Sequence, residues 1–257
     1  MKRRVKSVSE WVIERVVQAA GIAAIILVVL IFAFLLRNSL PIFNVRTIGE
    51  LLAGDRWSPT AGDGKFGMLP LLMGSLYVTV GALVIAVPLG LACAVFIAEA
   101  APARAKEILK PAVEMLAAIP SVVYGFLGLL VVGPWMAETF NLPIGQLAAL
   151  GSLLLAIMAI PTIVSVAEDA IHNVPRSVRN NSLALGATRW QTITRAILPS
   201  ARSGIVAAIL LGMGRAIGET MVVLMVTGNA AVIPKGLEGF LRPVRTMTAT
   251  IAAEMGE

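Results

Sequence analysis

Residues 174–199, VPRSVRNNSLALGATRWQTITRAILP, decide the fold of this chain, because they form a polar, helix-forming segment between two long apolar runs. The four arginines of this segment suit the cytoplasmic side of a membrane, although on composition alone it could be an ordinary loop that only fixes topology. Residues 183–187 predict a short helix that Gly186 can end or bend, since glycine reaches backbone conformations closed to other residues. Residues 188–197 predict a second helix that runs to Pro199, which restricts the chain before the next apolar run. We expect the two short helices to lie along the membrane face, where a protein outside the membrane can grip them.

The composition of the whole chain indicates an all-α integral membrane protein, built as a polytopic helical bundle. Of its 257 residues, 58% are hydrophobic and 14% are charged, and the mean hydropathy is +0.87; no soluble domain of this size needs so much apolar surface. In a soluble protein the net charge of +6 would suggest nucleic acid as a partner. These charges lie in loops, where membrane topology explains them, so nucleic acid is not expected. The single cysteine, Cys93, excludes an intramolecular disulfide, and one histidine, His172, gives no support to a metal site.

Five apolar runs are long enough to cross a bilayer. They comprise residues 16–36, 69–98, 108–132, 144–166 and 205–226. The third run is interrupted by Pro120 and Gly125, and the fourth contains Pro161 near its inner end. The first run is too long for a secretory signal and lacks a convincing cleavage site, so we interpret it as a retained helix. Residues 246–257 look like the approach to a sixth span that is absent from the chain, and we expect either a truncation or a partner that completes the bundle.

The distribution of lysine and arginine orients this layout. Of the 21 basic residues, seven lie in segments that the layout places outside and one, Arg215, lies in the fifth run. Because basic residues concentrate in cytoplasmic loops, the N-terminus and residues 174–199 are expected inside and Trp57 outside. The thirteen basic residues expected inside are Lys2, Arg3, Arg4, Lys6, Arg15, Arg104, Lys106, Lys110, Arg176, Arg179, Arg189, Arg195 and Arg202.

Two nucleotide-binding motifs are absent or only superficial. The pair Gly64-Lys65 is followed by Phe66 rather than by Ser or Thr, so the chain has no P-loop and is not expected to hydrolyse ATP by that route. Residues 212–218, GMGRAIG, differ from a dinucleotide fingerprint because the last glycine comes one residue late and no strand precedes them. Small residues let membrane helices approach closely, so we interpret them as part of a packing stripe. The stripe comprises Gly204, Ala208, Gly212, Ala216 and Thr220.

The spacing within residues 174–199 resembles the coupling ("EAA") loop of ABC-importer permeases. That loop reads Glu-Ala-Ala, three residues, Gly, nine residues, Ile, one residue and Leu-Pro, and Gly186, Leu198 and Pro199 match it. Residues 180–182 (Asn-Asn-Ser) stand in place of Glu-Ala-Ala, which removes a carboxylate able to pair with a basic patch on the ATPase. The resemblance implies that the segment docks on a cytoplasmic ATPase, through Asn180, Ala184, Gly186, Ala187, Arg189, Leu198 and Pro199.

Three further stretches resemble the PstC-type permease subunit of phosphate ABC importers. Residues 74–90 are similar to its second helix and residues 110–125 to its third, while residues 214–221, GRAIGETM, are similar to its fifth and are the most specific. With residues 57–59 and 66–67, the resemblance covers the chain from about residue 47 to its end.

This resemblance implies one transmembrane permease domain over residues 1–257, in the inner membrane, with six spans where five are visible. The implied partners are the lipid bilayer, a related PstA-type permease, two copies of a cytoplasmic PstB-type ATPase and an external PstS-type phosphate-binding protein. The partner ATPase would hydrolyse ATP, so this chain is expected to bind no cofactor.

Arg215 and Glu219 are the main candidates for the substrate path. A charge in the middle of a span costs on the order of 2.5–3.5 kcal/mol, and the planar fork of arginine suits bidentate binding of an oxyanion. Glu219 follows four residues later, so the alternative is an ion pair that the two residues form on one helix face. Hydroxyl groups near the predicted helix breaks could bind an anion, or could cap the backbone and pack helices instead. They belong to Thr79, Ser121, Tyr124 and Thr220.

We therefore expect a permease subunit of an ATP-driven importer for inorganic phosphate, which forms half of the translocation path. The residues do not separate phosphate from sulfate, molybdate or tungstate, because an arginine and hydroxyls serve any of these oxyanions. A proton-coupled carrier or an intramembrane enzyme using Glu114 and Glu219 is the alternative from a different class. Neither of these needs a coupling loop, and no second catalytic group lies at a useful spacing, so enzymatic activity is not expected.

Overall fold

The computed structural model describes residues 8–44, 46–59 and 64–254. It divides the chain into two compact units, Met1–Leu52 and Ala53–Glu257. The first unit contains α1 (Val8–Ser39), the 3₁₀ turn η1 (Leu40–Asn44) and most of α2 (Ile48–Ala53). Over Glu10–Asn44 the helical segment is 35 residues long, which confirms that the first predicted run is long and apolar enough to cross a membrane.

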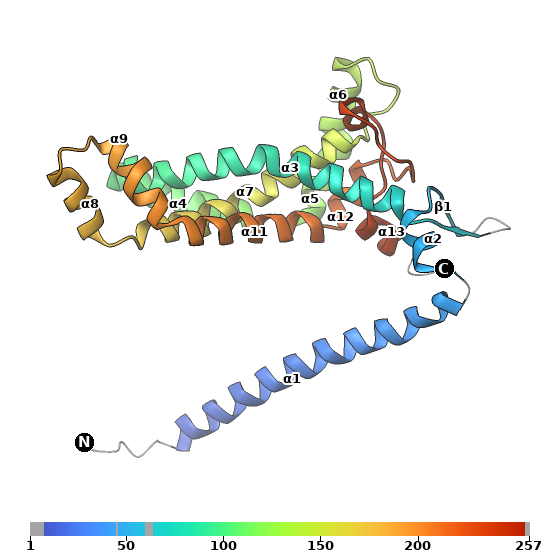
Figure 1. Cartoon of the computed structure of the whole chain (residues 1–257), viewed down its shortest axis with the longest axis horizontal. Coiled ribbons are helices and arrows are strands. Elements are labelled where there is room, and N and C mark those ends of the chain that lie inside the picture. Colours follow the sequence, from blue (N-terminus) through green and yellow to red (C-terminus); the bar gives the residue numbers. More distant parts are fainter. Residues whose placement is uncertain (1–7, 45, 60–63, 255–257) are drawn as a thin grey trace. The chain divides into compact units, whose positions relative to one another are not determined.

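Three long helices form the centre of the second unit: α3 (Leu69–Val95), α7 (Ala148–His172) and α11 (Arg202–Gly218). Figure 1 shows α3 and α11 running alongside α7. In the most apolar part of α7, 61% of the residues are buried inside the structure. The corresponding share for the span Leu69–Ala100, which includes α3, is 28%. α7 is therefore the central helix of the unit, and the helices that pack against it are α3, α11, α4 (Ala103–Ala118) and α12 (Met221–Val226).

The small residues of α11 face α7. A Cβ at Gly204 would lie 2.3 Å from Ala170 Cβ, and one at Gly212 would lie 2.5 Å from Ile163 Cγ1. Ala208 and Ala216 are buried on the same face. This confirms the packing interpretation of the stripe as far as Ala216, because small residues allow the two helices to approach closely.

The third predicted span, residues 108–132, is wrong in its position. The chain forms α4 (Ala103–Ala118) and breaks at Ile119–Pro120, and it then continues through α5 (Ser121–Leu127), the π-helical turn η3 (Gly128–Val132) and α6 (Gly133–Thr139). The helix long and apolar enough to cross a membrane is Ser121–Thr139. Proline disfavours a helical conformation in the residue before it, and α4 is too rich in charge to qualify. The expected interruption at Gly125 is absent, since α5 continues through it.

The fourth predicted span is confirmed with shifted ends, and the fifth is interrupted. α7 starts at Ala148 instead of residue 144 and continues through Pro161 to His172. α11 ends at Gly218, Glu219 is extended, and the short helix α12 (Met221–Val226) follows. The described residues thus contain four helices able to cross a membrane, or five if the segments that meet with a bend of 71° at Ala201 count as one span.

Short elements cover one end of the bundle. The strands β1 (Trp57–Ser58) and β2 (Lys65–Phe66) pair antiparallel and are the only strands among the described residues. The 3₁₀ turn η5 (Leu237–Leu241) and α13 (Met247–Glu254) follow α12, and α13 occupies the segment expected to approach a sixth span.

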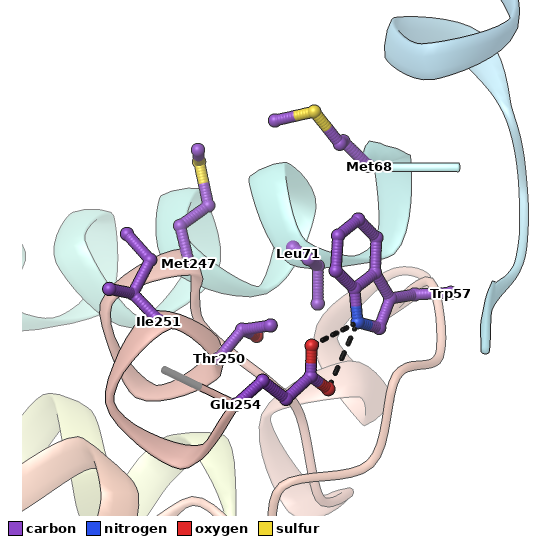
Figure 2. Close-up of a pocket in the computed structure, with 7 residues that line it drawn as sticks. All are labelled: Trp57, Met68, Leu71, Met247, Thr250, Ile251 and Glu254. Atoms are coloured by element: carbon purple, nitrogen blue, oxygen red, sulfur yellow. Dashed lines mark hydrogen bonds between the residues drawn. The ribbon is translucent and has the colours of Figure 1, made fainter. Parts of the chain in front are cut away.

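A polar contact ties the segment before α3 to α13. Figure 2 shows the indole N–H of Trp57 donating to both carboxylate oxygens of Glu254, at 3.1 Å each. Glu254 also forms an ion pair of 2.8 Å with Arg245. Apolar side chains of Leu71, Met247 and neighbouring residues line the groove beside this contact.

Residues 174–199 lie at the opposite end of the bundle (Figure 1). It comprises α8 (Arg176–Ala184), α9 (Arg189–Thr192), the π-helical turn η4 (Ile193–Ile197) and α10 (Leu198–Ser200). The chain therefore passes from the end of α7 through two short helices and returns into α11.

Candidate functional site

The coupling segment, residues 174–199, consists of two short helical pieces joined at Gly186. Gly186 has a φ of +84°, in the left-handed region that favours glycine, and the turn follows the end of α8. Thr188 starts α9 with a capping box: its hydroxyl accepts the backbone N–H of Gln191, and the Gln191 side chain accepts the N–H of Thr188. The prediction of two helices joined at a glycine is confirmed.

The bounds of these two helices differ from the prediction. The first helix was expected over residues 183–187 and instead occupies Arg176–Ala184, because Pro175 sits at its N-cap and the polar residues that follow extend the helix. The second does not stop at Pro199: the helical path continues through α10 and bends at Ala201. Proline is tolerated in the first turn of α10, where its missing N–H is not needed.

The predicted ATPase-contact residues lie mostly on the outside of the coupling segment. Among them, Ala187 and Leu198 are half-buried and the others are exposed: Asn180, Ala184, Gly186, Arg189 and Pro199. Two apolar side chains that were not predicted as contact residues are also exposed, Leu185 at 89% and Trp190 at 69%. Exposed tryptophan is a frequent anchor of protein interfaces, so the coupling segment presents both polar and apolar contact groups.

Two broken helices lie side by side in the second unit, and we call their gaps the first and the second break. The first is Ile119–Pro120 between α4 and α5, and the second is Glu219–Thr220 between α11 and α12. On the N-terminal side of both breaks, Arg215 Nη2 donates to the Ala117 carbonyl at 3.4 Å.

On the C-terminal side of both breaks, α5 and the turn η3 pack against α12. A Cβ at Gly125 would lie 3.4 Å from Val222 Cα, and one at Gly128 would lie 2.9 Å from Val226 Cγ1. Together with the Arg215 contact, these neighbours advance along both chains in the same direction. The two helices therefore run parallel with their breaks at the same depth.

Arg215 lies on α11 just before the second break and is partly exposed. Its Nη1 donates to the Thr162 hydroxyl on α7 at 3.2 Å, and its Nη2 contacts the Ala117 carbonyl. Both acceptors are neutral, and none of the ion pairs among the described residues includes Arg215. The guanidinium charge is therefore not neutralised by a carboxylate of the described chain.

The alternative ion pair between Arg215 and Glu219 does not form. It required both residues to lie on one face of one helix, but α11 ends at Gly218 and Glu219 has extended backbone angles. The Glu219 carboxylate instead accepts the backbone N–H of Val222 at 3.3 Å, in the first turn of α12. A carboxylate at this position is stabilised by the positive end of the helix dipole.

Glu219 also lines a small cavity at the second break. Its backbone carbonyl accepts the hydroxyl of Thr248 at 2.8 Å. The polar lining comes from α3, from the break itself and from the start of α13 with the residue before it, and comprises Ser75, Thr79, Glu219, Thr246 and Thr248. The break is thus surrounded by hydroxyl groups from distant parts of the sequence.

The four predicted hydroxyls serve different purposes. The Tyr124 hydroxyl donates to the Leu116 carbonyl at 3.2 Å and bridges the first break. The Thr220 hydroxyl contacts the Gly218 carbonyl at 3.4 Å. Backbone capping, the alternative considered for these groups, therefore applies to Tyr124 and Thr220. Thr79 is buried in the wall of the cavity, and Ser121 begins α5 beside the first break.

Four polar residues around the breaks escaped the sequence analysis: Ser75, Thr162, Thr246 and Thr248. Isolated hydroxyls in apolar helices commonly bond to their own backbone, as Ser75 does to Leu71 at 2.9 Å. Their sequence positions carried no signal that they would gather around Arg215 and Glu219.

An ion cluster joins α4 to the end of α7. Lys110 Nζ lies 2.7 Å from Glu168 and 3.0 Å from Asp169. Hydrogen bonds to Glu168 and then to Asp169 raise the pKa of the Lys110 ammonium above its usual range. Clusters of charged side chains like this one are typical of the membrane–water interface. This agrees with the finding that α4 is not one of the apolar spans.

The sequence of this chain matches a known protein family. Residues 86–254 match the model of the family described as "Binding-protein-dependent transport system inner membrane component". The matched range begins within α3 and ends with α13, so it includes the coupling segment and both breaks.

Curated relatives are similar over most of the chain. The "Probable ABC transporter permease protein YqgH" of Bacillus subtilis is 41% identical over 243 residues, which cover 94% of this chain and 78% of that protein. The "Phosphate transport system permease protein PstC" of Haemophilus influenzae is 34% identical over 270 residues, covering 96% of this chain and 84% of its own length. A protein of the same name from Mesorhizobium japonicum is 34% identical over 227 residues, covering 81% and 68%.

Proposed function

Since the chain belongs to the family of binding-protein-dependent transport system inner membrane components, we propose that it forms half of the translocation path of an ATP-driven importer of inorganic phosphate. The family is a group of transport components, and the chain is a multi-pass membrane protein. Relatives that carry the name of phosphate permeases support phosphate as the transported ion.

The observation that carries the proposal is the position of Arg215. Its guanidinium lies beside two helix breaks, and among the described residues it contacts only a hydroxyl and a carbonyl. Inside a membrane bundle an unneutralised arginine is costly and marks an ion path. Its planar fork can bind two oxygens of one phosphate, and the partial exposure leaves donors for such an ion.

The break beside Arg215 gives the path a part that can move. Glu219 contacts the start of α12 through its carboxylate and the first turn of α13 through its carbonyl. A helix with a break needs only a few dihedral angles to change direction. We therefore assign Glu219 a gating role and Arg215 the contact with the anion, with Thr79, Ser121, Tyr124 and Thr220 around them.

The coupling segment is the part that a cytoplasmic ATPase would contact. We assign the partners by class: a related permease of PstA type, two copies of a PstB-type ATPase and an external phosphate-binding protein of PstS type. The ATPase hydrolyses ATP, and this chain contributes no cofactor of its own. The charge bias supports a cytoplasmic N-terminus and coupling segment.

Uptake of radiolabelled phosphate by the complete complex in liposomes tests the proposal. ATP on the side of the ATPase and binding protein on the other side should drive phosphate accumulation, and excess sulfate or molybdate should not suppress it. Suppression by either oxyanion would reassign the substrate. Uptake driven by a proton gradient without ATP would instead identify a proton-coupled carrier.

A further inference from the structure

Resting on the proposed function, we propose that the ion pair between Glu99 and Arg179 transmits movement of the coupling segment to α3. Glu99 lies in the π-helical turn η2 (Phe96–Ala100), which continues α3 without a gap, and Arg179 lies on α8. Arg179 is thus a positioning residue that links the helix facing the ATPase to a helix that runs through the bundle.

Arg179 reaches two different elements at once. Its Nε and Nη2 both donate to Glu99 Oε1, the former at 3.1 Å. Its Nη1 donates to the Val174 carbonyl at 2.6 Å, and its Nη2 also contacts the Ile171 carbonyl on α7 at 3.1 Å. One side chain therefore joins α8 to η2 and to the end of α7.

The pair is shielded from water. The side chains of Arg179 and Glu99 are 22% and 12% exposed, whereas the Asp169 carboxylate that pairs with Lys110 at the same end is 63% exposed. Exposed pairs are weakened by solvent and salt, and removal of one partner from a shielded pair leaves an uncompensated charge. The Glu99–Arg179 link therefore resists displacement better than a surface pair.

Apolar packing alone holds α8 only loosely. None of the nine residues of α8, all of them described, is buried. By contrast, Ile197 of η4 is 1% exposed and packs in a cluster with Ala94, Ala98 and Ile171. The second half of the coupling segment is thus anchored by packing, whereas α8 contributes only the half-buried Val178 to the same cluster and is joined to η2 by the side chain of Arg179.

Both neighbours of the link carry irregular helix. η2 contains Glu99, and η4 lines the same groove as Glu99 and Arg179 through Ile193 and Ile197. π-helical turns of this kind are rare and are frequent at functional sites. Here they occur on both sides of the contact between the coupling segment and the bundle.

α3 carries the movement to the second break. Thr79 on α3 lines the cavity that contains Glu219, and it precedes Glu99 by twenty residues, or about 30 Å of helix at 1.5 Å per residue. A displacement of α8 that moves Glu99 therefore shifts the wall of the cavity beside the gate.

Replacement of Glu99 separates the two connections of Arg179. Glu99→Ala removes the link to α3 and leaves both carbonyl acceptors, Val174 and Ile171, in place. In complete complexes in liposomes, we expect normal assembly with the ATPase and normal basal ATP hydrolysis, while phosphate imported per ATP hydrolysed falls about fivefold or more. Glu99→Gln, which keeps an acceptor without the charge, should fall between the alanine variant and the native chain.

Asp169→Asn is the matched control, since it removes an exposed carboxylate from an ion pair at the same end and should leave phosphate imported per ATP unchanged. The native complex in the same preparation tests the proposed function separately, because only its failure to import phosphate counts against that function. A native transport ratio in Glu99→Ala at matched assembly would overturn the inference. Failure of both Glu99 variants to assemble would also overturn it and leave the pair as a tie that the fold needs.

Discussion

At the residue scale, the surroundings of Arg215 suit the contact with an anion that we propose. A guanidinium next to two helix breaks, with a hydroxyl and a carbonyl as its neighbours, keeps its charge available to an anion. An ion pair with Glu219 would have neutralised both residues, but the end of α11 at Gly218 separates them. The proposed function therefore gives the two residues different roles, and substitutions should separate them.

We predict that Arg215→Gln lowers phosphate uptake about 10- to 100-fold, the loss expected when a hydrogen bond to a charged group worth about 1.5–3 kcal/mol disappears. Arg215→Lys should also be poor, since a point charge does not reproduce a bidentate contact. Uptake by the double variant with Glu219→Gln should stay as low as that of Arg215→Gln, and Glu219→Gln alone should alter gating or leak. The measurement is uptake at matched assembly, and recovery in the double variant would refute contact between Arg215 and the anion.

Gly186 is the second residue whose chemistry is dictated by the backbone. Its φ of +84° costs an L-residue about 1–2 kcal/mol, and a β-branched side chain is a clear outlier there. Apart from the adjoining residues, no atom of the described chain lies within 4 Å of a Cβ placed at this position, so conformation and not space limits substitution. We predict that Gly186→Val weakens binding of the ATPase and phosphate-stimulated ATP hydrolysis without unfolding the membrane helices.

Gly186→Asn is the control, because asparagine enters the left-handed region more readily than other residues with a side chain. It should retain most ATPase binding in a pull-down, with the membrane level of the chain monitored. Equal transport by the valine and native chains would show that the turn does not need this conformation.

At the scale of elements, the contact between α11 and α7 depends on how closely the two helices approach. Gly212 faces Ile163, which is fully buried. At Gly214, two residues further along α11, no atom of the described chain beyond the helix's own neighbouring residues lies within 4 Å of an added Cβ. We predict that Gly212→Val lowers the stability of the detergent-solubilised chain by about 1–3 kcal/mol, the usual cost of overpacking. Gly214→Val should change the thermal midpoint much less, and equal shifts would contradict the packing role of the stripe.

The helices could be predicted from sequence better than their interruptions. Long apolar runs revealed α1, α3 and α7, because spanning helices need such length. The second break, however, lies at Glu219–Thr220, within an apolar run that contains no proline. Contacts with distant residues hold that break open, including the bond from Thr248 to the Glu219 carbonyl. Pro120 correctly indicated an interruption of the third predicted run. The charged residues of α4 explain why that run does not begin at residue 108 as a membrane span.

The candidate site was predictable to the same extent. A charge within an apolar run drew attention to Arg215, since such charges are expensive in a membrane. Arg179 was interpreted only as a loop charge, because nothing local indicates that Glu99, 80 positions earlier, would meet it. Hydroxyl groups such as Thr162 and Thr248 likewise acquire a role only through the fold. Sequence therefore predicted the charged centre of the site and missed its neutral and ion-paired surroundings.

At the scale of the whole molecule, the orientation in the membrane decides which partner meets which end. The coupling segment and the segment 227–246 lie on opposite ends of the second unit, as Figure 1 shows for α9 and α13. Most lysines and arginines lie in segments expected inside, although the first four of these, at residues 2–6, fall outside the described residues. The bias predicts a cytoplasmic coupling segment and N-terminus.

Labelling of single cysteines in intact cells tests this orientation. Leu185 in the coupling segment and Leu237 in η5 are matched probes, because they are 89% and 87% exposed, and the exposed Cys93 is first replaced by serine. An impermeant thiol reagent added outside should label Leu237→Cys and leave Leu185→Cys unlabelled until the membrane is permeabilised. Labelling of Leu185→Cys in sealed cells would show that the chain has the opposite orientation. The coupling segment would then lie where no ATPase with access to ATP could reach it.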